Sequence, residues 1–272
     1  MVKRLILGWR ITRYVFPALA GILVFSCTKA PDIAPMEQQA KVFAKSATAI
    51  SKITGFGMYV LSDTSVANSM IDFSGDLYLA EVVSTDTFGT GVLRVSIIDT
   101  NQVTGLSGLF TMTFSDFKAD TGTYIQFIVQ SVCYHDVCLN GKWALYTVSG
   151  DRGGQWLLQS SDIELRVTIA GMDYGFNADF RLRRDAGFQT AWPGLDDDEY
   201  SFDGNATCTF SDGTIAHFDV RDALTFSWDC TWLNRGTFSM VADGYDTQTA
   251  VAKDCSGKLS LEMMDSKVEV EM

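Results

Sequence analysis

The chain has 272 residues and a formal net charge of −12, from 33 acidic and 21 basic residues. An acidic excess of this size argues against binding to nucleic acid and against adhesion to anionic lipid through surface charge. Apolar residues make up 47% of the chain and aromatic residues 12%, so the composition argues against disorder, and the length fits one large or two small β-rich domains.

The first 26 residues have the pattern of a signal peptide. Four basic residues precede an uncharged run of 12 residues, Tyr14 to Phe25. A helix that crosses a bilayer needs about 20 apolar residues, so this run is short for a permanent span. The pattern therefore predicts a signal peptide over residues 1–26, whose removal takes the net charge from −12 to −16. The alternatives are an ordinary secretory signal with an incidental cysteine behind it, and an uncleaved anchor.

The residues at the predicted cleavage point, Val24-Phe25-Ser26-Cys27, resemble the lipobox of bacterial lipoproteins, in the looser form found in the Bacteroidota. The resemblance implies that Cys27 is acylated and becomes the first residue of the mature chain. It implies an outer-membrane anchor through N-terminal acyl chains, on the periplasmic side or at the cell surface. Several chains are needed for stable attachment, because each buried methylene contributes only about 0.8 kcal/mol.

Residues 27–35 are expected to form a tether, since they include two prolines. Apolar residues then recur every three or four positions with polar residues between them, which predicts an amphipathic helix over residues 36–54. Gly55 and Gly57 are expected to end this helix. Its apolar stripe is expected to pack on the sheet that follows.

From about residue 70 the apolar and polar residues alternate, as they do in strands with one buried face. Short segments that begin with a glycine recur, at Gly75, Gly141, Gly204, Gly236 and Gly257. Each of these glycines is expected to open a strand at a turn. Residues 55–272 are predicted to form roughly 12–14 strands of an antiparallel meander, built as a curled sheet, a sandwich or an open barrel. The fold class is therefore mainly β with one N-terminal helix, and the loose recurrence suggests two related halves near residues 70–150 and 160–272.

Five cysteines remain besides Cys27, and secreted cysteines usually pair. The first expected disulfide joins Cys133 and Cys138, which are close enough in sequence to staple a hairpin, and the second joins Cys230 and Cys255. Cys208 would then be a buried free thiol, although spacing alone does not fix the connectivity. A zinc loop that also uses His135 is the alternative for the first pair, but no second cluster of ligands accompanies it. No cofactor is expected.

Two further segments carry candidate ligand-binding residues. Residues 226–232 are expected to be a strand with Phe226, Trp228, Cys230 and Trp232 on one face. Such a strand is either part of the core or an aromatic ligand platform, and its regular alternation favours the core. The acidic run at residues 196–199 is expected to be a solvated loop, although clustered carboxylates also bind calcium. The calcium candidates are Asp196, Asp198 and Asp203. His217 is expected at an ordinary surface position.

The C-terminal third, about residues 195–272, carries a second resemblance. Its motifs are Asp203-Gly204, Ala223-Leu224, Cys230-Thr231-Trp232, Arg235-Gly236 and Asp254-Cys255. They are similar to those of uncharacterised Bacteroidota lipoproteins with recurrent glycine-led strands. The resemblance implies an outer-membrane location and a β architecture, and it brings no activity and no functional residue with it.

No nucleophile elbow, phosphate-binding loop or dinucleotide fingerprint occurs in the sequence, and the chain is not expected to be an enzyme. The leading hypothesis is a membrane-anchored lipoprotein whose β domain is a non-catalytic structural or binding module for a protein or glycan partner. The first alternative is a carrier of an apolar ligand inside the curled sheet, with the helix as lid or plug. Its cavity would be lined by residues such as Phe110, Phe180 and Trp228. The second alternative is a carboxylate-based hydrolase.

Overall fold

A computed structural model describes residues 33–62, 73–74, 76–85, 90–99, 103–115, 124–150, 156–186, 198–242, 248–263 and 266–272. The predicted signal peptide, Cys27 and most of the predicted tether lie outside these residues. Residues Ala34–Met272 form one compact unit, so the helix and the sheet belong together. Within the described residues, no helix has both the length and the apolar character that crossing a membrane requires.

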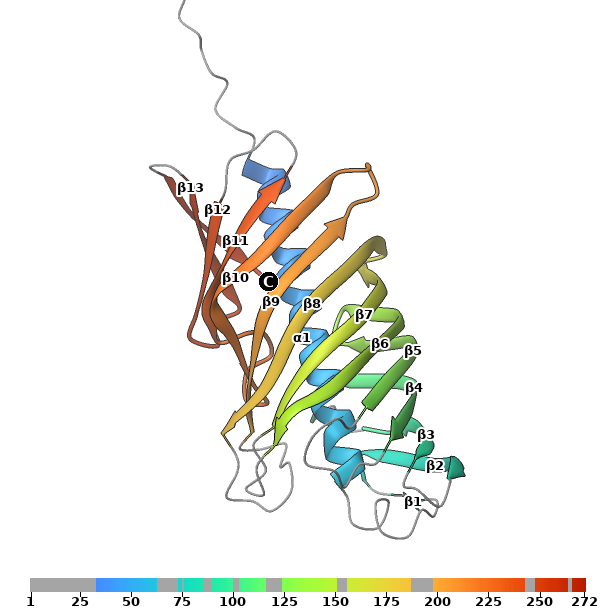
Figure 1. The fold of residues 1–272 in the computed structure, drawn as a ribbon. Coiled ribbons are helices and arrows are strands. Elements are labelled where there is room, and N and C mark those ends of the chain that lie inside the picture. The colour runs from blue at the N-terminus through green and yellow to red at the C-terminus, as the bar shows by residue number, and fades with distance from the viewer. Residues whose placement is uncertain are drawn as a thin grey trace, which may run out of the picture. The chain divides into compact units, whose positions relative to one another are not determined.

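The described residues form one helix and a single antiparallel sheet (Figure 1). The elements are α1 (Ile33–Ser62), β1 (Phe73–Ser74), β2 (Tyr78–Thr85), β3 (Gly91–Ile97), β4 (Leu106–Ser115), β5 (Tyr124–Tyr134), β6 (Val137–Gly150), β7 (Trp156–Ile169), β8 (Met172–Ala186), β9 (Glu199–Thr209), β10 (Ile215–Ser227), β11 (Arg235–Ala242), β12 (Gln248–Lys253), β13 (Lys258–Met263) and β14 (Ser266–Glu271). The 14 strands pair in chain order from β1 to β14. The predicted antiparallel meander is therefore confirmed, and it forms one curled sheet.

Helix α1 lies against the concave side of the curled sheet, which encloses it (Figure 1). Every residue from Val42 to Met58 is buried, and this includes the polar ones. The predicted helix and its packing on the sheet are confirmed, but its polar positions are buried as well, because the sheet curls around them as well as around the apolar stripe. The hydroxyl groups of Ser46 and Thr48 compensate for their burial by donating to backbone carbonyls one turn earlier, at 2.7 and 2.8 Å.

The helix also continues past its predicted end at Gly55 and Gly57. Both glycines lie where aromatic rings of the sheet approach the helix. A Cβ atom on Gly57 would lie 2.4 Å from the Phe127 ring, and one on Gly55 would lie 3.2 Å from the Tyr200 ring. These glycines therefore allow close packing of helix against sheet, and the favourable contacts outweigh their low helix propensity.

Aromatic side chains join the two halves of the helix to different parts of the sheet. Phe43, in the N-terminal half, lies 4.5 Å from the ring centre of Phe218 on β10 and 4.7 Å from that of Phe238 on β11. Phe56, in the C-terminal half, lies 6.0 Å from Tyr78 on β2 and 6.5 Å from Phe110 on β4. The helix therefore bridges strands that are distant in the sheet order, and it fills the interior between them.

The recurrent glycines do not all open strands. Gly141 lies inside β6 and Gly204 inside β9, with φ angles of +134° and +141°. A Cβ atom at either position would lie 2.3 Å from a backbone carbonyl oxygen of a neighbouring strand. These glycines therefore permit a close approach of two backbones within the sheet. Gly257, in the turn before β13, fits the prediction, whereas Gly75 lies outside the described residues.

The sheet continues across the boundary between the two predicted halves. Strands β6 and β7 flank residues 151–155, and they pair from Val137↔Ile169 to Gly150↔Trp156. The described part of the β region is therefore one continuous sheet.

Candidate functional site

The outer face of the sheet has a large bulge in the middle of β10. Relative to β9, the pairing moves from Asp219↔Asn205 to Leu224↔Phe202, so β10 advances by five residues over a stretch in which β9 advances by three. Relative to β11, it moves from Val220↔Phe238 to Thr225↔Arg235, again five residues against three. Bulges redirect side chains and often lie next to functional sites.

The bulge changes which side chains face solvent. Alternation along β10 is regular up to Val220, but Arg221, Asp222 and Ala223 are then exposed in succession. Gly236 on β11 lies opposite the bulge with φ +121°, and a Cβ atom there would lie 2.6 Å from the Ala223 carbonyl oxygen. Glycine at this position is therefore part of how the bulge is accommodated.

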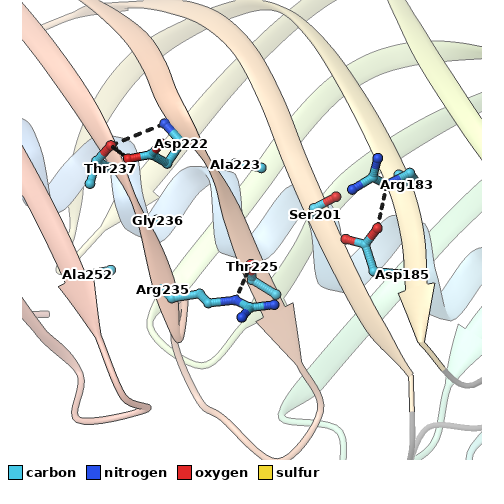
Figure 2. Close-up of a pocket in the computed structure, with 10 residues that line it drawn as sticks. All are labelled: Arg183, Asp185, Ser201, Asp222, Ala223, Thr225, Arg235, Gly236, Thr237 and Ala252. Atoms are coloured by element: carbon cyan, nitrogen blue, oxygen red, sulfur yellow. Dashed lines mark hydrogen bonds and ion pairs between the residues drawn. The ribbon is translucent and has the colours of Figure 1, made fainter.

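A depression of about 550 Å³ lies beside the bulge on the outer face, between β8 and β12 (Figure 2). Four directly opposed residues on successive strands cross it, in the order Arg183, Ser201, Thr225 and Arg235. The two small hydroxyl residues in the middle are buried, and the two arginines at the ends are half exposed or more. The depression therefore has a floor of small polar groups between two guanidinium groups.

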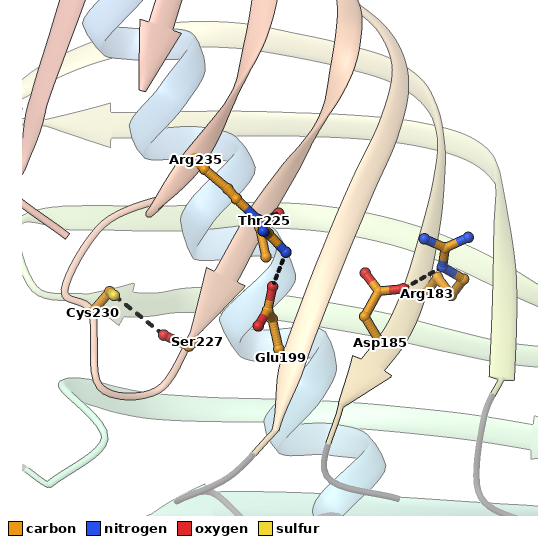
Figure 3. Close-up of polar contacts among 7 residues, drawn as sticks. All are labelled: Arg183, Asp185, Glu199, Thr225, Ser227, Cys230 and Arg235. Carbon is orange, nitrogen blue, oxygen red and sulfur yellow. Dashed lines mark hydrogen bonds and ion pairs between the residues drawn. The ribbon is translucent and has the colours of Figure 1, made fainter. Parts of the chain in front are cut away.

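Polar contacts hold the charged side chains around this depression (Figures 2 and 3). The Arg183 guanidinium donates to Asp185. Arg235 donates from Nε to Thr225 Oγ1 at 3.1 Å and from a terminal nitrogen to Glu199 Oε1 at 2.7 Å. At the bulge itself, the Thr237 hydroxyl donates to Asp222 Oδ2 at 2.5 Å. Each of these charges therefore has a partner, and the side chains are oriented before any ligand arrives.

A second depression, of about 270 Å³, lies on the other side of the bulge. Its polar lining residues come from β9, β10 and β11 and are Asn205, Thr207, His217, Asp219, Arg221 and Ser239. Arg221 is 3.0 Å from Asp219 and donates to the Ser239 hydroxyl at 3.0 Å. His217 is exposed, as predicted, and its Nδ1 is 3.1 Å from the Thr207 hydroxyl.

A second polar group of residues lies inside the molecule, where two lysines of α1 meet the segment after β10. Lys45 Nζ is 2.6 Å from Asp136 Oδ2 and 4.5 Å from the ring centre of Trp232. Lys52 Nζ donates to the carbonyl oxygens of Ser227 at 2.5 Å and Cys230 at 3.1 Å. These carbonyl and ring contacts are what make two buried ammonium groups tolerable.

Residues 228–234 form a loop and not the strand that was predicted, because β10 ends at Ser227. The loop turns inward over the lysines: Trp228 lies 4.5 Å above Lys52 Nζ, and the Tyr134 hydroxyl donates to the Thr231 carbonyl oxygen at 2.5 Å. Its two tryptophans are half-buried. The rings therefore pack on helix lysines, and the loop, which connects β10 to β11, is hydrogen-bonded to the β5–β6 hairpin.

This enclosure changes the acidity of three groups. Burial lowers the pKa of Lys52 from 10.5 to about 7, against an opposing effect of the Asp229 carboxylate. Burial raises the pKa of Tyr134. Burial also lowers the pKa of His135, and Lys52 and Lys45 add to this while Asp136 opposes it. Lys52 and the loop carbonyls of Ser227 and Cys230 therefore form a buried polar contact between the helix and the loop.

Both expected disulfides are present, Cys133–Cys138 and Cys230–Cys255. The first closes the β5–β6 hairpin, so a disulfide and not a zinc loop occupies this segment. The second ties the loop at residues 228–234 to the turn before β13. Cys208 is a buried free thiol, as predicted, and burial raises its pKa.

The calcium candidates do not come together. Asp198 is buried and belongs to an ion pair with the equally buried Arg184, whose Nε and terminal nitrogen lie 2.9 and 2.5 Å from Asp198 Oδ1. The Tyr200 hydroxyl donates to Oδ2 of the same carboxylate at 2.6 Å. The prediction of a solvated acidic loop was therefore wrong for Asp198. Asp203 is exposed on β9, and Asp196 lies outside the described residues.

The Asp198 group has two further features. Burial, together with the Asp198 charge and hydrogen bond, raises the pKa of Tyr200 well above its usual value. Among the residues that the structure describes, no group of three or more histidine, cysteine, aspartate or glutamate side chains is arranged to hold a metal ion.

The residues proposed to line a carrier cavity are packed against other groups. Phe110 lies 6.0 Å from the Phe127 ring, Phe180 stacks on Phe202 at 4.6 Å, and Trp228 covers Lys52. Helix α1 occupies the interior that a carrier would leave for its ligand. This packing argues against the carrier hypothesis.

Comparison of the chain with protein-family models, with curated proteins and with solved structures found no match. The resemblance to Bacteroidota lipoproteins therefore stays a prediction from the motifs.

Proposed function

We propose that the chain is a lipoprotein of the bacterial cell envelope, anchored in the outer membrane through Cys27, whose β domain is a non-catalytic binding module for a polar partner, a glycan or a protein. The observation that carries the binding part is the depression beside the β10 bulge. It has the volume of a small-ligand site and is lined by pre-oriented polar groups.

Two observations support the location. The cysteines at positions 133, 138, 230 and 255 are joined in disulfides, which persist in oxidising compartments. The sequence before Cys27 has the signal pattern described above.

The binding proposal is tested with a variant that fills the depression. Ala223 is exposed on the bulge and lines the depression, so Ala223→Trp places a large ring there without disturbing the core. The matched control is Leu109→Trp, at an exposed position on β4 far along the sheet. Glycan and peptide arrays are probed with the soluble mature domain of each form. We expect ligands that bind the parent and the control but not Ala223→Trp; equal binding by all three forms would refute the proposed site.

The anchor is tested in cells. The parent protein is expected in the membrane fraction and a Cys27→Ser variant in the soluble fraction of a lysate. Protease treatment of intact and lysed cells then distinguishes the cell surface from the periplasmic side. Retention of the Cys27→Ser protein in membranes would contradict the lipid anchor.

A further inference from the structure

We propose that the two depressions beside the β10 bulge are subsites for one extended neutral oligosaccharide, which crosses the bulge between them. This inference rests on the proposed function and names its ligand class. It starts from the fact that β9, β10 and β11 line both depressions.

Residues of the bulge line both depressions. Its successive residues Arg221 and Asp222 line different depressions, Arg221 the smaller and Asp222 the larger. On β11, Thr237 belongs to the larger depression and Ser239 to the smaller. The parts of β11 that line them are centred about four residues apart, which corresponds to roughly 13 Å along an antiparallel strand. A single chain of a few sugar units therefore reaches from one depression to the other.

The charges in the lining favour a neutral ligand. The larger depression has two arginines and two aspartates, and the smaller has Arg221 and Asp219, so the formal charges cancel in each. The arginines are already paired with carboxylates, namely Arg183 with Asp185, Arg221 with Asp219 and Arg235 with Glu199. An anionic ligand would have to compete for these guanidinium groups, and it would be repelled by a chain whose net charge is −12.

The hydrogen-bonding groups match a polyol. A hydroxyl group both donates and accepts, and the lining offers fixed guanidinium donors beside carboxylate and hydroxyl acceptors. None of the ten residues that line the larger depression has a large apolar side chain, as Figure 2 shows. Such a site lacks the apolar anchor pocket on which most protein interfaces depend. In the smaller depression Val241 is exposed and offers an apolar surface to the carbon face of a sugar ring.

The test uses the soluble mature domain and titration calorimetry with neutral gluco-, manno- and xylo-oligosaccharides, from disaccharides to hexasaccharides. Uronic-acid oligosaccharides of the same lengths and a peptide array are the comparison ligands. Arg183→Ala alters the larger depression and His217→Ala the smaller, and both side chains are exposed, so the variants are expected to fold. The control is Arg94→Ala, another exposed arginine paired with a glutamate, on β3.

We expect a neutral hexasaccharide to bind more tightly than the disaccharide, and each of the two site variants to weaken it about tenfold while Arg94→Ala leaves it unchanged. Equal affinity for the disaccharide and the hexasaccharide, or sensitivity to only one site variant, would overturn the two-subsite arrangement. Binding of only acidic oligosaccharides or peptides would overturn the ligand class and leave the proposed binding function standing. If neither the neutral nor the comparison ligands bind, the proposed function fails as well.

Discussion

The ammonium group of Lys52 lies 4.5 Å from the centre of the Trp228 ring, beneath a loop that a disulfide holds in place. This contact joins the central helix to the segment after β10, which is distant from it in the sequence. Because Lys52 is only 2% exposed, the stability of the fold is sensitive to the protonation of its amine.

Stability is expected to rise with pH above neutrality because of Lys52. The native amine has a pKa of about 7, whereas the unfolded chain keeps the ordinary value of 10.5. Between these values the unfolded state binds one more proton than the native state, so the free energy of unfolding increases with pH. It increases by at most about 1.4 kcal/mol per pH unit, and the gain is lost progressively as the pH falls from 10.5 to about 7.

The measurement is urea denaturation at several pH values from 7.5 to 9.5, where this group alone accounts for about 2–3 kcal/mol. A Lys52→Met variant is expected to lose the slope, and a Lys258→Met variant, at a half-exposed position on β13, is expected to keep it. The chemical shift of Lys52 Cε provides a direct readout, with an expected midpoint near pH 7. A midpoint near pH 10 would show that the amine is well solvated.

The helix glycines are expected to be sensitive to substitution in a definite order. A Cβ atom on Gly57 would lie 2.4 Å from the Phe127 ring and 2.9 Å from the Met112 sulfur, whereas one on Gly55 would lie 3.2 Å from the Tyr200 ring. Gly57→Ala is therefore expected to destabilise the protein by about 1–3 kcal/mol through overpacking, despite the better helix propensity of alanine. Gly55→Ala is expected to cost less, and thermal unfolding of the two variants compares them. A stabilised Gly57→Ala protein would mean that the helix and sheet are less tightly packed there.

The sheet could be predicted from the sequence because its signal is local. Alternating residues such as Phe110, Met112 and Phe114 are buried, and the polar residues between them are more accessible. The enclosure of the helix could not be predicted in this way. Lys45 and Lys52 are spaced like residues of a solvent-facing helix surface, and only the curl of a distant sheet buries them.

The candidate site left a weak signal in the sequence. The alternation of apolar and charged residues on β10 is interrupted at Arg221-Asp222, where two charged residues are adjacent. An interrupted alternation of this kind is typical of a bulge. The calcium hypothesis failed for a related reason. A carboxylate in an acidic run is expected to be solvated, but Asp198 is paired with Arg184, which lies 14 residues earlier, on β8.

The buried Arg184–Asp198 pair is expected to be the ion pair most sensitive to loss of one partner. Both side chains are almost completely buried, at 1% and 0% exposure. Asp198→Ala would remove the carboxylate that is paired with the buried Arg184 and that accepts from the Tyr200 hydroxyl, at an expected cost of about 3–5 kcal/mol. Glu262→Ala, which removes one partner of an exposed pair with Lys267, is expected to cost less than about 1 kcal/mol.

Urea denaturation of both variants measures the difference. A second comparison uses Asp198→Asn, which keeps an acceptor oxygen for Tyr200 but removes the charge. It is expected to lie between the parent and Asp198→Ala. If Asp198→Ala were no less stable than Glu262→Ala, the buried pair would contribute nothing beyond a surface contact.

The two disulfides are expected to differ in their contributions. Cys230–Cys255 joins residues 25 apart, and Cys133–Cys138 joins residues 5 apart. The entropy that a cross-link removes from the unfolded chain grows with the size of the closed loop. Alanine replacement of the Cys230–Cys255 pair is therefore expected to cost about 3–4 kcal/mol, and replacement of the Cys133–Cys138 pair about 2 kcal/mol. Denaturation of the two double variants tests this order, and an inverted order would contradict it.

Loss of the Cys230–Cys255 disulfide is also expected to change the titration of Lys52. The Cys230 carbonyl oxygen accepts a hydrogen bond from the Lys52 amine, and Trp228 covers the amine from the same loop. Without the disulfide the loop is held less tightly and water reaches the amine, which moves the pKa of Lys52 back toward 10.5. The expected result is a smaller rise of stability between pH 7.5 and 9.5 in the Cys230→Ala/Cys255→Ala protein than in the Cys133→Ala/Cys138→Ala protein. Equal slopes would show that the loop keeps its position over the helix without the disulfide.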